Sequence, residues 1–265
     1  MKALVTRPAH EALAWVADLQ AHGVQAEALS LIDILPPADL APLQAAWQGL
    51  AAYSAVMFVS GNAVEHFFAS KPPEVRVEWS FNAIKNVAIP RCWATGPGTA
   101  RALLAQGVPA TQIDAPTASA ARFDSETLWA LVCGQMAGVG QRVLMVRGVD
   151  EQQSTGRPWL EDQLLAVGAQ VDTVLAYCRT LPNLPAERLQ RLRDAAQDGT
   201  VWLFSSSQAI NHLQQLDSSV SWAQARSVAT HPRIAQAARA VGFGVVCESR
   251  PALDDLVRSI KSLHD

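Results

Sequence analysis

The chain has 265 residues, 49% of them hydrophobic, and its 21 Lys and Arg against 24 Asp and Glu give a formal net charge of -3. A chain of this length fills one large domain or two ordinary ones. The slightly acidic balance, without any basic run, argues against nucleic acid as a partner. No segment reaches the ~20 apolar residues of a membrane-spanning helix, so we expect no membrane partner either.

The amino-terminal apolar run is too short for a signal peptide, so we expect a cytoplasmic protein. The histidines show no paired metal-ligand spacing, and the cysteines form no CxxC motif. We therefore expect no metal and no other cofactor, and we expect reduced cysteines that fill apolar positions. The cysteines are Cys92, Cys133, Cys178 and Cys247.

The first part of the chain is a strand-helix-strand unit. The predicted elements are a strand over 3–7, a helix over 9–22 and a strand over 26–32. The unit recurs between Arg142 and Tyr177, and Gly23 and Gly168 end the two helices. We expect the apolar stripes of these helices to face a core. The stripes are Leu13, Val16, Ala17 and Leu19 in the first copy and Trp159, Leu160, Leu164 and Leu165 in the second.

A second repeated stretch reads YSAVMFVSGNAVEHFFA at 53–69 and GTVWLFSSSQAINHLQQ at 199–215. Each copy predicts a strand, a tight turn and a helix, with Ser60 and Ser206 at the junctions. The first N–H groups of a helix carry a partial positive charge and suit an anion. The alternative interpretation is that the two serines are only helix N-caps.

A third repeated element reads WATGPGTARALLAQGV at 93–108 and SVATHPRIAQAARAVGF at 227–243. In both copies a strand ends on small polar residues and a helix begins. Each half of the chain then closes with another strand, at 110–115 and 244–248, and another helix.

Strands that alternate with helices of this length indicate parallel sheets covered on both faces. Ten strands in two matching sets predict an α/β protein with two flavodoxin-like domains, each a parallel five-stranded sheet covered by helices. Proline-rich linkers at 34–42 and 179–187 separate the repeated parts. Ligands bind beyond the carboxyl ends of such strands, so we expect a cleft between the domains that is lined by helix amino termini.

Common catalytic motifs do not account for the chain. GPGTAR begins like a dinucleotide fingerprint, but Arg101 replaces its last glycine and no acidic residue ends the next strand pattern. The sequence also contains neither a GxxxxGK[ST] loop nor a GxSxG elbow. What remains is a cleft with many backbone donors and a few arginines, which suits a large polyanion whose chemistry needs mainly positioning.

Eight motifs follow one another in a specific order and spacing. They are LVTRPA, LSLIDILPP, FVSGNAV, ATGPGTARALLAQG, FDSETL, VLMVRG, LAYCRTLP and FSSSQAI. No single motif is highly specific, but together they resemble the uroporphyrinogen-III synthase family over nearly the whole chain.

The resemblance implies a cofactor-free lyase of tetrapyrrole and haem biosynthesis. Such an enzyme cyclises hydroxymethylbilane to uroporphyrinogen III, with inversion of ring D and loss of water. The resemblance also implies a discontinuous domain of residues 1–35 and 178–265 and an inserted domain of residues 36–177, joined by a two-stranded hinge. We expect a monomer. The sequence does not decide whether the chain makes a transient contact with the enzyme that supplies the substrate.

The family's site residues are carried over by position. The substrate-binding positions are Ser60, Gly61, Asn62, Gly96 and Thr99 in the first copy and Ser206 and Ser207 in the second. Tyr177, at the end of the middle strand, corresponds to a group that hydrogen-bonds or protonates the leaving oxygen. The alternative is that Tyr177 is a half-buried strand aromatic.

One departure from the family concerns the second glycine-proline-threonine turn of many members. This chain has His231 and Arg233 there, so either of them is expected to replace a hydroxyl contact. Arg7 and Arg147 end matched strands and are either partners of substrate carboxylates or ties for nearby loops.

The implied substrate carries eight carboxylates, whereas the protein is slightly acidic. Recognition should therefore come from helix amino termini and a few arginines. The enzyme must also prevent spontaneous ring closure without inversion, which is a task of orientation. The rival hypothesis is a non-catalytic two-domain binding protein for an anionic small molecule, because the sequence indicates no nucleophile and no metal.

Overall fold

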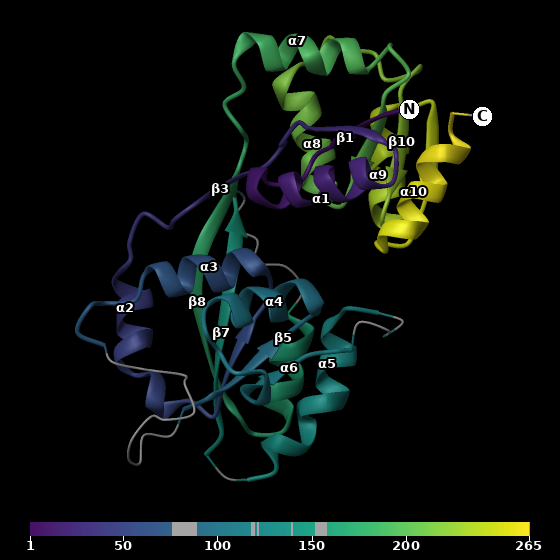
Figure 1. Ribbon diagram of the computed structural model, residues 1–265. Coiled ribbons are helices and arrows are strands. Elements are labelled where there is room, and N and C mark those ends of the chain that lie inside the picture. The colour runs from purple at the N-terminus through teal and green to yellow at the C-terminus, as the bar shows by residue number, and fades with distance from the viewer. Residues whose placement is uncertain (76–88, 118–119, 121, 139, 152–157, 265) are drawn as a thin grey trace. The chain divides into compact units, whose positions relative to one another are not determined.

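The computed structural model of the protein describes residues 1–75, 89–117, 120, 122–138, 140–151 and 158–264 (Figure 1). The chain divides into two compact units. Unit 1 is Met1–Asp33 with Thr180–Asp265, and unit 2 is Ile34–Arg179. Whether these units are the two folding domains expected from the sequence stays a prediction, and each unit is described by itself.

Unit 1 contains a five-stranded sheet in the order β11-β10-β9-β1-β2, in which every neighbouring pair is parallel. Its strands are β1 (Lys2–Val5), β2 (Gln25–Ala28), β9 (Val201–Phe204), β10 (Arg226–Ala229) and β11 (Val245–Glu248). Its helices are α1 (Ala9–Ala21), α7 (Ala186–Ala195), α8 (Ser207–Leu216), α9 (Pro232–Val241) and α10 (Leu253–Ser262). Counted along the chain, the sheet has the 2-1-3-4-5 order of the flavodoxin-like fold.

The sheet of unit 2 has the order β3-β8-β7-β4-β5-β6, and the pairs from β8 to β6 are parallel. The strands are β3 (Asp33–Leu35), β4 (Ala55–Phe58), β5 (Arg91–Ala94), β6 (Ile113–Asp114), β7 (Arg142–Asp150) and β8 (Gln170–Thr180). The α-helices are α2 (Ala41–Gln48), α3 (Gly61–Ala69), α4 (Pro97–Ala105), α5 (Ser125–Val132) and α6 (Trp159–Ala166). Three short 3-10 helices are η1 (Leu50–Ala52), η2 (Ala110–Gln112) and η3 (Cys133–Met136).

The two sheets confirm the duplication that the sequence predicts. β1, α1 and β2 hold the places in unit 1 that β7, α6 and β8 hold in unit 2, and β9, β10 and β11 correspond to β4, β5 and β6. The β1-α1-β2 segment comes first in the chain of unit 1, whereas its copy, β7-α6-β8, comes last in unit 2. The two units therefore have the same order of matched strands in the sheet but a different order of these strands along the chain. The described part of the chain has one strand more than predicted, because β3 lies beside β8 at the edge of the second sheet. That these two strands form a hinge between domains stays a prediction.

The alternation of side chains along β4 explains why helices cover both faces of its sheet. Val56 and Phe58 belong to a core with side chains of α2, α3 and α4, whereas Ala55 and Met57 belong to a core with side chains of α5 and α6. Figure 1 shows these two groups of helices on either side of the strands. Both faces are apolar, which is expected of a buried parallel sheet.

In unit 1, the two faces of β9 have different cores. Val201 and Leu203 pack with side chains of α1 and α10. On the other face, Trp202 and Phe204 stack at 6.1 Å between ring centroids and make edge contacts with Phe243. The Trp202 indole N–H also donates to the carbonyl of Ala195 at 3.1 Å, so the buried ring keeps its polar group satisfied.

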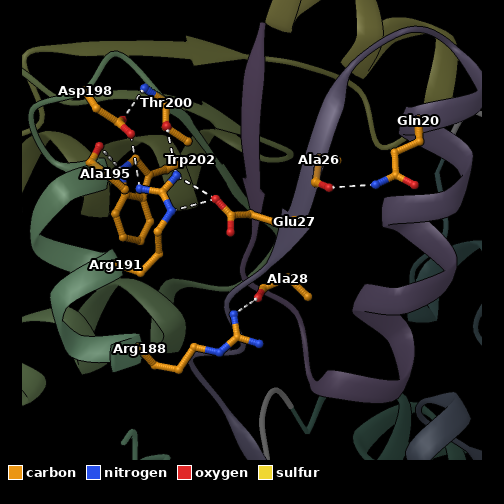
Figure 2. Close-up of polar contacts among 10 residues, drawn as sticks. All are labelled: Gln20, Ala26, Glu27, Ala28, Arg188, Arg191, Ala195, Asp198, Thr200 and Trp202. Atoms are coloured by element: carbon orange, nitrogen blue, oxygen red, sulfur yellow. Dashed lines mark hydrogen bonds and ion pairs between the residues drawn. The ribbon is translucent and has the colours of Figure 1, made fainter. Parts of the chain in front are cut away.

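Helix α7 is tied to the edge strand β2 through Arg191 (Figure 2). The Arg191 guanidinium donates to a carboxylate oxygen of Glu27 at 2.7 Å, to Asp198 at 3.2 Å and to the hydroxyl of Thr200 at 3.1 Å. Burial by itself would raise the pKa of Asp198, but hydrogen bonds from Thr200 and the charge of Arg191 outweigh it and lower that pKa. Arg191 therefore ties α7 to β2 and to the loop that leads into β9.

Three helical positions differ from the expected stripes. Leu13 is 66% exposed, Leu165 is 54% exposed and Ala17 is exposed as well, although all three were expected to face a core. Helix α1 instead buries Ala12 and Leu19, two turns apart on one face, and Leu13 lies 100° round the helix from Ala12. The stripe prediction was wrong there because an alanine faces the sheet.

The cysteine and strand predictions also need correction. Every cysteine is unpaired, as expected, but Cys133 is exposed in η3 and fills no apolar position. Only Cys92 is fully buried, and burial raises the pKa of its thiol. The strand expected over 110–115 is η2 followed by the two-residue β6. Among the described residues, no helix is long and apolar enough to cross a membrane.

Candidate functional site

The first cluster of predicted site residues lies at the carboxyl ends of β4 and β5. These strands are neighbours, with Phe58 opposite Ala94, so the turns that follow them are adjacent. Ser60 precedes α3 and Gly96 precedes α4 in these turns. The fold therefore places the amino termini of two helices beside each other, at the edge of the sheet where parallel α/β folds bind ligands.

Ser60 is the N-cap of α3. Its backbone is extended, with φ -164° and ψ 167°, and its Oγ accepts the N–H of Ala63 at 3.2 Å. Ser60 is therefore a helix N-cap, and its further role in binding an anion stays a prediction. Capping leaves the N–H groups of Gly61 and Asn62 at the first turn of the helix, where the partial positive charge is concentrated. The Asn62 side chain itself is only 5% exposed.

The turn before α4 uses no side-chain cap. Gly96 is extended, and a Cβ at this position would meet the Cβ of Phe123 at 3.2 Å. Thr99 lies in the first turn of α4 and is 6% exposed. Gly96 thus lets the backbone approach Phe123 closely, while the Thr99 side chain is largely covered by protein.

Tyr177 and Ser60 are brought together from positions 117 residues apart. The Tyr177 hydroxyl lies 3.0 Å from Ser60 Oγ, and either hydroxyl can be the donor. The Tyr177 ring is 4% exposed. Because Ser60 Oγ already accepts from Ala63, it can also donate its hydrogen to the phenol oxygen. The tyrosine therefore meets the amino terminus of α3, an arrangement that the sequence did not reveal.

His66 is a neighbour of Tyr177 that the sequence did not single out as a candidate site residue. It lies on α3, about one and a half turns after the helix begins at Gly61, and its ring stacks beside that of Tyr177, with centroids 6.0 Å apart. Its matched residue in the other half, His212, is buried and its Nδ1 lies 2.6 Å from the carbonyl oxygen of Leu31. His212 is thus a packed structural histidine. No local sequence signal separates His66 from His212. The difference arises because the pairing of β8 within the sheet brings Tyr177 beside His66.

The two matched arginines both contact a carboxylate of the helix that follows them. Arg7 donates to Glu11 at 2.9 Å and lies over the ring of Trp15 at 4.2 Å. Arg147 is 5% exposed and donates to Glu161 of α6 at 3.4 Å. These contacts favour the loop-tying alternative. A role for either guanidinium in binding a substrate carboxylate stays a prediction.

Unit 1 carries the second copy of the cluster. β9 and β10 are neighbours, with Phe204 opposite Ala229, so the turns before α8 and α9 are adjacent as well. Ser206 caps α8 by accepting the N–H of Gln208 at 3.2 Å, and Ser207 is the first residue of that helix. The sequence prediction of two similar strand ends is confirmed.

His231 has a structural role at the place where this chain departs from the family. Its Nδ1 accepts the N–H of Arg233 at 3.1 Å, so the imidazole caps α9 as the serines cap α3 and α8. Both His231 and Arg233 are exposed. Gly96, at the equivalent place before α4, has no side chain to cap its helix, so the departure adds a cap and an exposed guanidinium to the start of α9.

The described residues contain no group of three or more His, Cys, Asp or Glu side chains that could hold a metal ion. The two clusters present backbone N–H groups, hydroxyls, the imidazoles of His66 and His231, the guanidinium of Arg233 and a phenol. Such groups bind carboxylates and move a proton at a single oxygen.

Comparison with known proteins agrees with this architecture. The sequence model of the family described as uroporphyrinogen-III synthase HemD matches residues 14–258, which span parts of both units. A uroporphyrinogen-III synthetase from Helicobacter pylori is 14% identical with a TM-score of 0.62, and the match covers 99% of this chain and 100% of that one. A mutant uroporphyrinogen III synthase from Thermus thermophilus is 15% identical with a TM-score of 0.53, over 100% of this chain and 98% of that one. At such identities, the structures show a shared fold.

Proposed function

Because the chain belongs to the uroporphyrinogen-III synthase family, we propose that it cyclises hydroxymethylbilane to uroporphyrinogen III, with inversion of ring D and loss of water. Membership of the family makes it an enzyme of porphyrin and haem biosynthesis. The observation that carries the proposal is the family match over residues 14–258, which includes the predicted site residues of both clusters except Arg7.

The geometry of the two clusters supports a substrate rich in carboxylates. Each unit presents the amino termini of two neighbouring helices at the carboxyl edge of its sheet: α3 and α4 in unit 2, and α8 and α9 in unit 1. Such termini attract anions without requiring a net positive protein, which suits a chain of net charge -3. We therefore assign substrate binding to these turns and the exposed Arg233.

Tyr177 is the group we assign to the leaving oxygen. Cyclisation begins when the hydroxyl on the terminal methylene of the substrate departs, and a phenol can give its proton to that oxygen so that water leaves. Ser60 would then donate to the resulting phenolate, beside the positive end of α3. The pyrrole carbon that forms the last bond of the macrocycle loses one proton when its ring regains aromaticity. The phenolate can take up this proton, which restores the phenol for the next turnover. A positioned acid of this kind is worth ~100- to 10,000-fold in rate.

The decisive experiment supplies freshly prepared hydroxymethylbilane to the purified full chain and separates the porphyrin isomers after oxidation. The control is the same incubation without protein, which closes spontaneously to the type I isomer. We expect the type III isomer to dominate with the protein. Type I alone, from protein shown to be folded by circular dichroism, would overturn the proposal.

The rival function, a non-catalytic binding protein for an anionic small molecule, is separated by the same incubation. A binding protein would retain the tetrapyrrole on a gel-filtration column and leave the isomer ratio equal to that of the control. Multiple turnovers to type III at substoichiometric protein would exclude it.

A further inference from the structure

The hydrogen bond between Tyr177 and Ser60 spans an intervening strand. Tyr177 is on β8, Ser60 follows β4, and β7 lies between these strands in the sheet. Neighbouring strands are ~4.8 Å apart, so the tyrosine must reach across about two such spacings. Its ring can do so only by lying over the backbone of β7.

Gly148 is the residue of β7 over which the ring lies. Gly148 and Tyr177 are direct partners in the β7–β8 register. A Cβ built on Gly148 would fall 2.3 Å from Cζ, 2.4 Å from Cε2 and 2.7 Å from Cε1 of the Tyr177 ring. These distances are far below van der Waals contact, and both partners belong to paired strands, so neither can easily move.

The local register produces this pairing. Arg147 pairs with Leu175, but the next residue, Gly148, pairs with Tyr177, so Ala176 is an extra residue on β8. A bulge of this kind changes the direction in which the following side chain points. Without it, Gly148 would face Ala176. The bulge and the glycine together therefore direct the ring across β7.

We propose that Gly148 is a positioning residue that holds the Tyr177 hydroxyl at Ser60, an inference that rests on the proposed function for its effect on turnover. Gly148 is not one of the described glycines that have a positive φ, so its backbone conformation alone does not require glycine. The requirement comes from the ring. Any side chain at 148 displaces the phenol from the amino terminus of α3 and leaves the rest of the site in place.

The first test is structural and needs no substrate. The chain has two tyrosines, so ring-labelled tyrosine gives two sets of NMR signals, which Tyr53→Phe assigns. In Gly148→Ala we expect the Tyr177 signals to shift and those of Tyr53 to stay. Gly134→Ala is the matched control, because a Cβ there meets nothing within 4 Å. Unmoved Tyr177 signals in Gly148→Ala would overturn the proposal.

The second test is kinetic and uses a double-mutant cycle. We expect Gly148→Ala to lower kcat about tenfold or more while KM changes by less than about threefold, because the proton donor moves but the anion-binding turns stay. Added to Tyr177→Phe, the same change should lower kcat little further. Equal losses in the two backgrounds would mean that Gly148 acts independently of the hydroxyl, which contradicts the proposal.

Two further outcomes are defined. If Gly148→Ala does not fold, adding Tyr177→Ala should restore folding because it removes the ring, and a double variant that is also unfolded would overturn the proposal. If the NMR shift occurs but the wild-type chain makes no type III isomer, the proposed function fails and the positioning of Tyr177 by Gly148 stands.

Discussion

Tyr177 illustrates what a single side chain gains from its surroundings. The ring is 4% exposed and its hydroxyl meets Ser60 Oγ at 3.0 Å, so the tyrosine is neither a solvent-facing strand aromatic nor an isolated core residue. A buried hydroxyl normally has a partner, and here the partner is the N-cap of a helix whose terminus favours negative charge. The strand-aromatic alternative explains the ring but leaves the hydroxyl at a helix terminus unexplained.

Tyr177→Phe keeps the ring over Gly148 and removes only the hydroxyl. We expect turnover to fall at least tenfold, towards the lower end of the range for a positioned acid, because the pyrrole nitrogen also assists departure of the hydroxyl. The type I isomer should accumulate as substrate closes spontaneously. The melting temperature should change little, since one neutral hydrogen bond contributes about 0.5–1.5 kcal/mol. Wild-type turnover with pure type III product would remove Tyr177 from the mechanism.

Ser60→Ala and Thr99→Ala should each lower turnover by tenfold or less, because the backbone N–H groups beside them survive and a neutral hydrogen bond is worth about 0.5–1.5 kcal/mol. Ser60→Ala should also cost about 1 kcal/mol of stability through its cap, measured by urea unfolding. Ser206→Ala is the matched control, because it loses a cap that has no tyrosine beside it. A thousandfold loss of turnover in folded Ser60→Ala or Thr99→Ala would show that a hydroxyl takes part in the chemistry.

At the scale of elements, the chain caps several of its helices with different side-chain acceptors. Ser60, Ser206 and Asp124 cap α3, α8 and α5 with oxygen, whereas His231 caps α9 with Nδ1. Each acceptor satisfies an N–H that the helix itself cannot. The departure at His231 therefore gives α9 a side-chain cap that α4 lacks, and it changes the groups on offer to a ligand.

His231→Ala should destabilise the protein by about 0.5–2 kcal/mol, because α9 loses its cap, and His231→Asn should restore most of the loss. Urea unfolding at neutral pH, followed by circular dichroism, measures both. Equal stability of the alanine variant and the wild type would show that water replaces the imidazole at no cost.

Arg191 joins α7 to the edge strand β2, so its removal should lower the free energy of unfolding of unit 1. We expect Arg191→Ala to cost about 1–2 kcal/mol at neutral pH, since its partners are charged but the guanidinium is partly exposed. The lowered pKa of Asp198 stabilises the fold above the pKa of an unfolded Asp. The cost of Arg191→Ala should therefore shrink as the pH falls through the lowered value.

Arg188→Ala is the control for this prediction. Arg188 lies one turn earlier on α7 and donates to a single backbone carbonyl, that of Ala28, at 3.0 Å on the exposed surface (Figure 2). Its loss should stay within about 0.5 kcal/mol, as for ordinary surface substitutions. Equal costs for the two variants would mean that the ion pairs of Arg191 contribute no more than one surface contact.

At the scale of the whole molecule, both units arrange their matched strands in the same order within the sheet, although these strands follow one another in a different order along the chain. In unit 2 the strands that form the parallel sheet come from one continuous segment, whereas unit 1 needs both ends of the chain. The chain passes between the units at residues 33–34 and 179–180, within strands that are neighbours in the sheet. Each unit has its own cores on both faces of its sheet.

The fragment 34–179 should therefore fold alone and unfold cooperatively, because its cores need no residue of unit 1. A chain in which a short Gly-Ser linker joins residue 33 to residue 180 should fold as unit 1. Circular dichroism and urea unfolding of each protein test this. An unfolded 34–179 fragment would show that the units depend on each other for stability.

The sequence by itself determined the types of the elements, their duplication and the strand-end positions of the candidate site. These features are local: alternation and helical periodicity, glycines at helix ends, and small polar residues at strand ends all act over a few residues. The stripe position Leu13 failed because neighbouring Ala12 faces the core, and periodicity cannot tell which of two adjacent apolar residues a sheet will cover.

Only the tertiary structure decided that Tyr177 meets Ser60, that Gly148 must lack a side chain and that His66 differs from His212. Each of these depends on which strands lie side by side and in what register, including one extra residue on β8. Strand pairing is a long-range choice made by the packing of both faces of a sheet. A chain's local pattern specifies that a residue stands on a strand, but only the neighbouring strands specify what that residue touches.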